Sequence, residues 1–211
     1  MTILLEGRGR RFRFVHDANG NLAEKIDPDD PAGTTHYGWD SSNRLVSLKQ
    51  PGLSASYVYD AYGRRIQVRV RRGDATSTVQ YVYEGRQVRD GKLSHRLIAG
   101  LSLDETIARL AINADGSVDS GQSRRFLTDM LNSVLAELTD DGAATVASSH
   151  AYSPYGNTGT FGADTANNPY RYTSREADPS GLYFYRGRDY DPTLGGGRFI
   201  EQLVGEGMES H

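Results

Sequence analysis

Two aspartates near the end of the chain have a spacing that would suit acid–base chemistry. Asp189 and Asp191 are two residues apart, so on a β-strand their carboxylates would lie on one face. Such a pair can divide the roles of general acid and general base. Asp191-Pro192 favours another interpretation, because aspartate before proline commonly begins a turn. We expect both aspartates to cap that turn, and we predict that the protein is not an enzyme.

Residue types that support metal or cofactor binding occur without the required spacing. The chain has no cysteine, and its five histidines show no His-x-x-x-His pattern. The acidic stretch 27–31 lacks the spaced ligands of a calcium loop, and the glycines at 195–197 are not followed by the Lys-Ser or Lys-Thr of a phosphate loop. The sequence therefore predicts neither a metal nor a cofactor.

Composition and charge favour short strands and give no reason to expect nucleic acid. The 211 residues include 24 glycines and 13 tyrosines, and the net charge is -3. The basic stretch Arg64–Arg72 alternates with Ile66, Val68 and Val70, as the polar face of a strand does, so we expect its arginines, Arg65 included, to face solvent. No stretch approaches the roughly 18 apolar residues of a membrane span.

A short pattern recurs along the chain: an aromatic residue, any residue, usually a second aromatic, Asp or Ser, two residues, then Gly or Asn. We interpret the Asp or Ser and the Gly or Asn as turn residues. These pairs are Asp17 and Gly20, Asp40 and Asn43, Asp60 and Gly63, Asp129 and Asn132, and Ser153 and Gly156. A degenerate copy covers 81–84, and an eroded copy is expected between it and Asp129. His16 and His150 take aromatic positions, where we expect packing.

Each copy predicts a β-hairpin. Asp or Ser at the first turn position and Gly or Asn three residues later suit a type I turn followed by a left-handed residue. A lone hairpin is marginally stable, so we expect an all-β fold in which antiparallel hairpins pair into one continuous sheet. Two alternatives stay open. A β-propeller is the rival fold, and Phe126, Met130, Val134 and Leu138, which recur every four residues, would also suit a helix.

The last part of the chain is a dense run of tyrosine, arginine and glycine. It contains Gly181-Leu182-Tyr183-Phe184-Tyr185, Arg188-Asp189-Tyr190-Asp191-Pro192 and Gly197-Arg198-Phe199-Ile200. With the upstream copies, this order resembles the rearrangement-hotspot (RHS) or YD-repeat family over residues 14 to 200. The resemblance implies structural roles for Tyr183, Tyr185, Arg188, Tyr190, Asp191, Pro192, Arg198 and Phe199.

The resemblance also implies a function. In the RHS family the repeats form a strip of β-sheet that spirals into a hollow shell, which in bacteria encloses a C-terminal toxin used in competition between cells. We therefore expect a shell fragment, with hairpin repeats in 1–115, a core-like segment in 116–200 and a short tail in 201–211. The expected partners are upstream shell repeats and a toxin or other protein. The expected location is secreted or at the cell surface within a larger protein, or cytoplasmic if this fragment is made alone.

The sequence departs from the family after Ile200. Relatives carry an Asp-Pro-x-Gly motif linked to self-cleavage, whereas this chain continues with Glu201 and ends 11 residues after Ile200. We therefore expect neither self-cleavage nor an effector domain. The second functional hypothesis is a carbohydrate- or protein-binding surface module, because exposed tyrosines and Trp39 could stack on sugars. The shell requires aromatic side chains buried between strands, while the binding module requires an exposed row.

Overall fold

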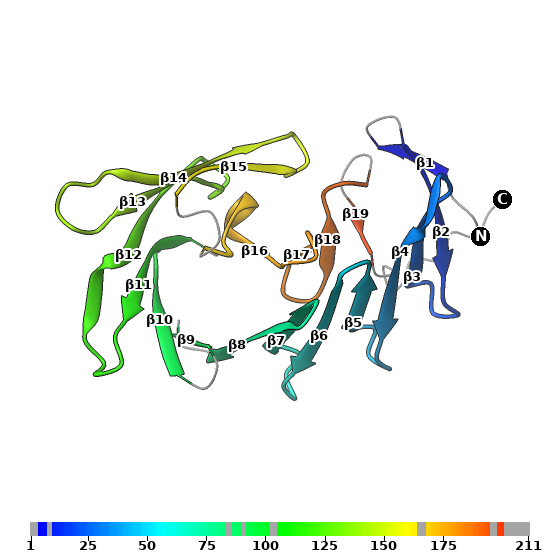
Figure 1. The fold of residues 1–211 in the computed structure, drawn as a ribbon, viewed down its shortest axis with the longest axis horizontal. Helices are drawn as coiled ribbons and strands as arrows, with labels where there is room; N and C mark the ends of the chain where they lie inside the picture. The colour runs from blue at the N-terminus through cyan, green and yellow to red at the C-terminus, as the bar shows by residue number, and fades with distance from the viewer. Residues whose placement is uncertain are drawn as a thin grey trace.

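The chain folds into a strip of β-hairpins that curls around its own last strands (Figure 1). The computed structural model describes residues 4–7, 10–82, 86–89, 92–101, 105–163, 168–194 and 198–200. Fifteen strands form one antiparallel sheet, the main sheet, in which every strand pairs with its neighbours in chain order from β1 to β15. This order confirms the predicted all-β fold of continuous hairpins, because propeller blades would divide the strands among separate sheets.

The strands of the main sheet are β1 (Leu4–Gly7), β2 (Arg10–His16), β3 (Leu22–Asp27), β4 (Asp30–Trp39), β5 (Leu45–Gln50), β6 (Leu53–Tyr59), β7 (Arg65–Arg72), β8 (Ala75–Val82), β9 (Arg86–Arg89), β10 (Lys92–Ala99), β11 (Thr106–Ile112), β12 (Val118–Thr128), β13 (Val134–Thr139), β14 (Val146–Tyr152) and β15 (Thr158–Gly162). A 3-10 turn, η1 (Tyr172–Ser174), and a small antiparallel sheet follow. The small sheet contains β16 (Glu176–Ala177), β17 (Tyr183–Phe184), β18 (Asp189–Asp191) and β19 (Arg198–Phe199). We call the described residues 168–194 and 198–200 the terminal segment.

Each repeat turn has five residues, and its first residue organises it. In the third copy the Asp60 N–H donates to the Arg64 carbonyl at 2.9 Å, and the Gly63 N–H donates to the Asp60 carbonyl at 3.0 Å. Asp60 Oδ1 also accepts the N–H groups of Tyr62 and Arg64, both at 2.9 Å. Gly63 has φ of 77°, which glycine tolerates. The other turns of this kind begin at Asp17, Asp40, Asp129 and Ser153, with positive φ at Gly20, Asn43, Asn132 and Gly156.

Two more turns of this kind occur where the sequence pattern did not locate a copy. The Asn113 N–H donates to the Ser117 carbonyl at 2.9 Å, and the Asp178 N–H donates to the Leu182 carbonyl at 2.8 Å. The Asn113 turn joins β11 to β12 and lies in the long step where an eroded copy was expected. The degenerate copy at 81–84 falls partly outside the described residues.

A β-bulge accompanies the repeat turns and shifts the alternation of side chains. Val58 pairs with Gln67 while Tyr59 pairs with Arg65, which leaves Ile66 between two pairs. Arg65 therefore turns into the protein and is only 2% exposed. The expectation that Arg65 faces solvent with the other arginines of this stretch was wrong, because simple alternation ignores the extra residue. Equivalent shifts occur at Val15/His16, Gly38/Trp39 and Leu127/Thr128.

In three copies of the repeat that the structure describes, an aromatic residue at the third position connects its hairpin to the one before it. Trp39 Nε1–H donates to the Leu22 carbonyl at 2.8 Å, and the Tyr59 hydroxyl donates to the Leu45 carbonyl at 2.8 Å. Both acceptors lie beside a bulge, where the regular ladder of the strands is interrupted. The same contact joins Tyr152 to the Val134 carbonyl at 2.5 Å. The side chain of one repeat thus satisfies a backbone group of the preceding repeat.

Burial differs between the aromatic positions of the repeat. Phe14, Tyr57 and His150 take the first position and are buried, in line with the packing expected for His150. His16 takes the third position and is exposed, so the packing role expected for it was wrong. The third position lies next to the turn, where Trp39 is covered through its bond to the previous repeat.

The segment from Phe126 to Leu138 forms a hairpin rather than a helix. β12 and β13 pair across the turn that begins at Asp129. Met130 lies on this turn and is exposed, although a helix would have aligned it with Val134.

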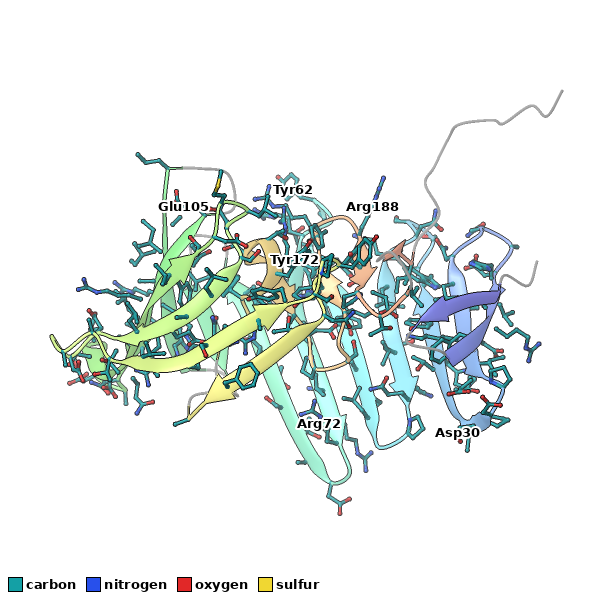
Figure 2. All side chains as sticks on the ribbon, turned by 90° about the horizontal axis from the view of Figure 1, so that it is seen from above. Asp30, Tyr62, Arg72, Glu105, Tyr172 and Arg188 are labelled. Carbon is teal, nitrogen blue, oxygen red and sulfur yellow. The ribbon has the colours of Figure 1, made fainter. Side chains whose placement is uncertain are left out.

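The repeat turns lie on one side of the main sheet, at the same ends of the strands. Figure 2 shows Tyr62 on this side and Arg72 on the opposite side. None of the described residues forms a helix long and apolar enough to cross a membrane.

Removing the hydroxyl of Tyr59 tests the contact between repeats. Tyr59→Phe should lower the free energy of unfolding by about 1–3 kcal/mol, because the Leu45 carbonyl loses its tyrosine donor. Urea unfolding followed by circular dichroism measures this. Tyr62→Phe is the matched control: Tyr62 is 85% exposed, and we expect a change below about 0.5 kcal/mol. Equal losses in the two variants would contradict the proposed role of the bond.

The carboxylate of Asp40 should make stability depend on acid pH. Burial opposes its ionisation, but hydrogen bonds from Arg44 and Ser42 hold the pKa of Asp40 below its ordinary value of 3.8. This stabilisation is present above that ordinary value and is lost as the pH falls through the lower, folded-state pKa. Asp40→Ala should therefore lower the free energy of unfolding by about 1 kcal/mol at neutral pH, and the difference from the unaltered protein should shrink in acid. Asp74→Ala, at an exposed turn, serves as the control; a difference for Asp40→Ala that is independent of pH would count against this account.

Candidate functional site

The terminal segment covers the concave face of the main sheet. Leu182, Leu194 and Ile200 belong to the same apolar cluster as side chains from β2 to β7. The Leu22 N–H also donates to the Ile200 carbonyl at 3.0 Å. In Figure 1 the strands β16–β19 lie within the curve of the main sheet. The residues that hold this segment in place form the candidate site.

Arg65 is the buried cation at the centre of this contact. Its Nη2 lies 2.8 Å from Glu176 Oε2, and its Nη1 lies 4.0 Å from Asp189 Oδ1. The guanidinium also stacks 3.8 Å from the ring centre of Phe184. Burial opposes the charged form, but the neighbouring Glu176 and other acidic groups raise the pKa of Arg65 above its ordinary value. Arg65 thus stays charged and binds three residues of the terminal segment at once.

A buried tyrosine and an aspartate make a second contact beside Arg65. The Tyr57 hydroxyl donates to Asp178 Oδ2 at 2.6 Å. Burial and the charge of Asp178 raise the pKa of Tyr57 well above its ordinary value, so the phenol keeps its proton. Asp178 Oδ1 accepts the Ser180 N–H at 2.8 Å within its own turn. Asp178 therefore shapes the terminal segment and fastens it to β6.

Asp189 and Asp191 do not form an acid–base pair. Asp189 faces Arg65 on β7, whereas Asp191 Oδ2 lies 2.9 Å from Lys25 Nζ on β3. Asp191 caps the turn as expected, since its Oδ1 accepts the Thr193 N–H at 2.8 Å. The capping role expected for Asp189 stays a prediction, and its buried carboxylate is directed to Arg65 on the main sheet.

The other residues implied by the family resemblance have varied placements. Tyr183 is buried, and the Tyr185 hydroxyl lies 2.6 Å from Thr173 Oγ1. The Pro192 carbonyl accepts a hydrogen bond from Asn157 Nδ2 at 2.8 Å. Arg188 is exposed (Figure 2), and its carbonyl accepts the Tyr185 N–H at 2.7 Å. Tyr190 bonds to the Tyr155 carbonyl. Arg198 and Phe199 form β19, and their side chains lie outside the described residues.

A second group of buried charges lies near β13. Glu137 Oε1 is 3.2 Å from His150 Nε2 on β14 and 3.6 Å from Arg171 Nη1 on the terminal segment. His150 Nδ1 lies 3.1 Å from Thr160 Oγ1 on β15. The Arg171 carbonyl also accepts the Val134 N–H at 3.0 Å. The terminal segment is therefore tied to both halves of the main sheet.

Among the described aromatic residues, Tyr62, Tyr155 and Phe161 are exposed, whereas others that a sugar-binding row would use are covered. Tyr37 and Tyr57 are buried, and Trp39 is partly covered with its N–H directed to a backbone carbonyl. Across the described residues no group of three or more His, Cys, Asp or Glu side chains could hold a metal ion. The acidic stretch that begins at Asp27 forms the tip between β3 and β4, where Asp27 Oδ1 accepts the Asp29 N–H at 3.0 Å.

Sequence analysis missed Arg65 and Asp178 as site residues. The signal for Asp178 was present, because Asp178-Pro179-Ser180-Gly181 has the spacing of the repeat turn. Arg65 could have been suspected only by placing a bulge after the Asp60 turn. Its partner Glu176 is 111 positions away, and no local pattern joins the two.

Replacing Arg65 tests the buried charge cluster. Arg65→Met should lower the free energy of unfolding by about 3–5 kcal/mol, because Glu176 and Asp189 lose their buried counter-ion. Arg69→Met, on the exposed face of the same strand, should change it by less than about 0.5 kcal/mol. Thermal or urea unfolding measures both variants. A loss of similar size in the two would mean that the ion cluster does not hold the terminal segment.

Comparisons with known proteins agree with this architecture. Residues 16–55 match the family model described as RHS Repeat. A crystal structure of TcdB2-TccC3-TEV matches with a TM-score of 0.73 and 20% identity, over 99% of this chain and 11% of that one. A Photorhabdus luminescens Tc holotoxin pore matches with a TM-score of 0.65 and 19% identity, over 95% of this chain and 12% of that one. A comparison with curated proteins found no match.

The chain thus spans about a tenth of the length of the solved chains that it matches. At this level of identity the likeness establishes the fold. The resemblance seen in the sequence is confirmed by the family match: residues 16–55 match the RHS repeat model, and the chain as a whole has the fold of a segment of these toxin structures.

Proposed function

We propose that this chain is part of the wall of an RHS shell, that its terminal segment lines the shell from inside, and that the complete shell encloses and delivers a toxin polypeptide. The observation that carries the proposal is the curled fifteen-stranded strip whose concave face is covered by a segment of the same chain. A strip of this kind can extend by adding hairpins at its edges, because each strand needs only its neighbours.

The distribution of aromatic side chains supports a wall rather than a binding surface. First-position residues such as Tyr57 pack under the terminal segment, and third-position residues such as Tyr59 bond to the neighbouring repeat. Both classes are therefore occupied in holding strands together. This proposal assigns the protein a structural role without catalysis, and a location outside the cell as part of a larger protein.

The shell role can be tested in a chimaera. The part of TcdB2-TccC3 that matches this chain would be replaced by residues 1–200, with the C-terminal region of TccC3 kept as cargo. Limited proteolysis should then leave the cargo intact, because the closed wall excludes the protease. Cargo that is digested as fast as isolated cargo, in a chimaera that keeps its β-sheet circular dichroism, would contradict the proposal.

Two matched variants distinguish a shell wall weakened by the loss of Arg65 from a chimaera that never forms a closed shell. The chimaera with Arg65→Met should lose protection of its cargo, because the terminal segment is no longer held by its buried cation. The chimaera with Arg69→Met should keep full protection, since Arg69 is exposed. Gel analysis of the digestion time course measures both.

A further inference from the structure

One hairpin turn is bound by the terminal segment through its backbone. The turn Ser153–Asn157 joins β14 to β15, and three of its carbonyls in succession accept tyrosine hydroxyls. These bonds run from Tyr172 to the Pro154 carbonyl at 3.0 Å, from Tyr190 to the Tyr155 carbonyl at 3.0 Å, and from Tyr183 to the Gly156 carbonyl at 3.1 Å. The next residue, Asn157, donates to the terminal segment through its side chain. Four consecutive residues are therefore contacted.

The three tyrosines also pack against one another. The ring centres of Tyr172 and Tyr183 are 6.2 Å apart, and those of Tyr183 and Tyr190 are 6.5 Å apart. The row extends to Tyr152 on β14, whose ring centre is 5.7 Å from that of Tyr172. Such tilted ring pairs add stabilisation to the burial of the rings. Ring packing thus fixes the hydroxyl groups of Tyr172, Tyr183 and Tyr190 relative to one another.

Gly156 leaves the space that this arrangement needs. A Cβ at this position would lie 2.5 Å from Cδ1 of Tyr172, which is closer than real side chains approach. At the equivalent Gly63, a Cβ would meet nothing within 4 Å. Both glycines have positive φ, 84° at Gly156 and 77° at Gly63. Gly156 therefore provides both the positive φ of the turn and the space for the Tyr172 ring, whereas Gly63 provides only the positive φ.

We propose that the Ser153–Asn157 turn is the seat that receives the tyrosine row of the terminal segment and fixes its register, with Gly156 as the positioning residue. Recognition goes through carbonyl groups, so the identity of the exposed side chain at Tyr155 is of little consequence. The seat thus determines that the terminal segment contacts the turn of the β14–β15 hairpin. This inference does not depend on what the assembled protein encloses.

Hydrogen exchange measured by mass spectrometry on the whole chain tests the seat. Gly156→Ala should speed exchange of the peptide that covers residues 170–194 by about tenfold or more relative to the peptide that covers residues 45–70, because the added methyl displaces the Tyr172 ring. Gly63→Ala is the control, because it adds a methyl group at a similarly unfavourable φ but meets no neighbouring atom. It should leave exchange of residues 170–194 unchanged relative to exchange of residues 75–82. Tyr155→Ala should leave the exchange of the terminal segment unchanged.

A double variant tests the steric argument directly. Once Tyr172→Ala has removed the ring, adding Gly156→Ala should cause no more loss of urea stability than Gly63→Ala causes in the same background. If Gly156→Ala alone does not fold, the double variant should still fold. The proposal is overturned if Gly156→Ala and Gly63→Ala affect the terminal segment equally, or if the double variant fails to fold while Tyr172→Ala with Gly63→Ala folds.

Discussion

The hydrogen bond from a third-position aromatic side chain to the carbonyl beside the preceding bulge is the contact on which the strip depends. The bulge interrupts the regular strand ladder there, and Trp39 and Tyr59 donate to these carbonyls from the next hairpin. Without these donors, the Leu22 and Leu45 carbonyls would lose a partner beside the bulges. A bulge of the same kind, at Val58/Tyr59, turns Arg65 into the protein, so this type of irregularity recurs at the contacts between repeats and at the cation of the site.

Charge is divided unequally across the contact between sheet and terminal segment. Around β3 and β7 the main sheet supplies cations and the terminal segment supplies carboxylates, as in the pairs of Lys25 with Asp191 and of Arg65 with Glu176. Near β13 the polarity is reversed, since Glu137 on the sheet faces Arg171. The segment therefore fits in one orientation only, because a reversed orientation would bring like charges together in a buried setting.

Much of the strip could be predicted from the sequence, and little of the site. The turns beginning at Asp40 and Asp60 carry their conformation in local residue choice, so hairpins followed from spacing alone. The bulges could not be predicted from spacing, because an inserted residue such as Ile66 has no distinctive residue type. Contacts such as Tyr57 with Asp178 join residues 121 positions apart and arise from how the strip curls. Such long-range pairs need the tertiary structure.

The chain order of the main sheet has a consequence for cooperativity. Strands that touch only their chain neighbours form a one-dimensional array, which can lose hairpins one at a time from either end. The ion pair between Lys25 and Asp191 joins residues 166 positions apart. It therefore links an early hairpin of the array to the terminal segment without a covalent bond. Fraying of the first hairpins must then break contacts made by the last strands. The protein should therefore resist mechanical extension as a single unit and give way abruptly once the terminal segment is pulled free.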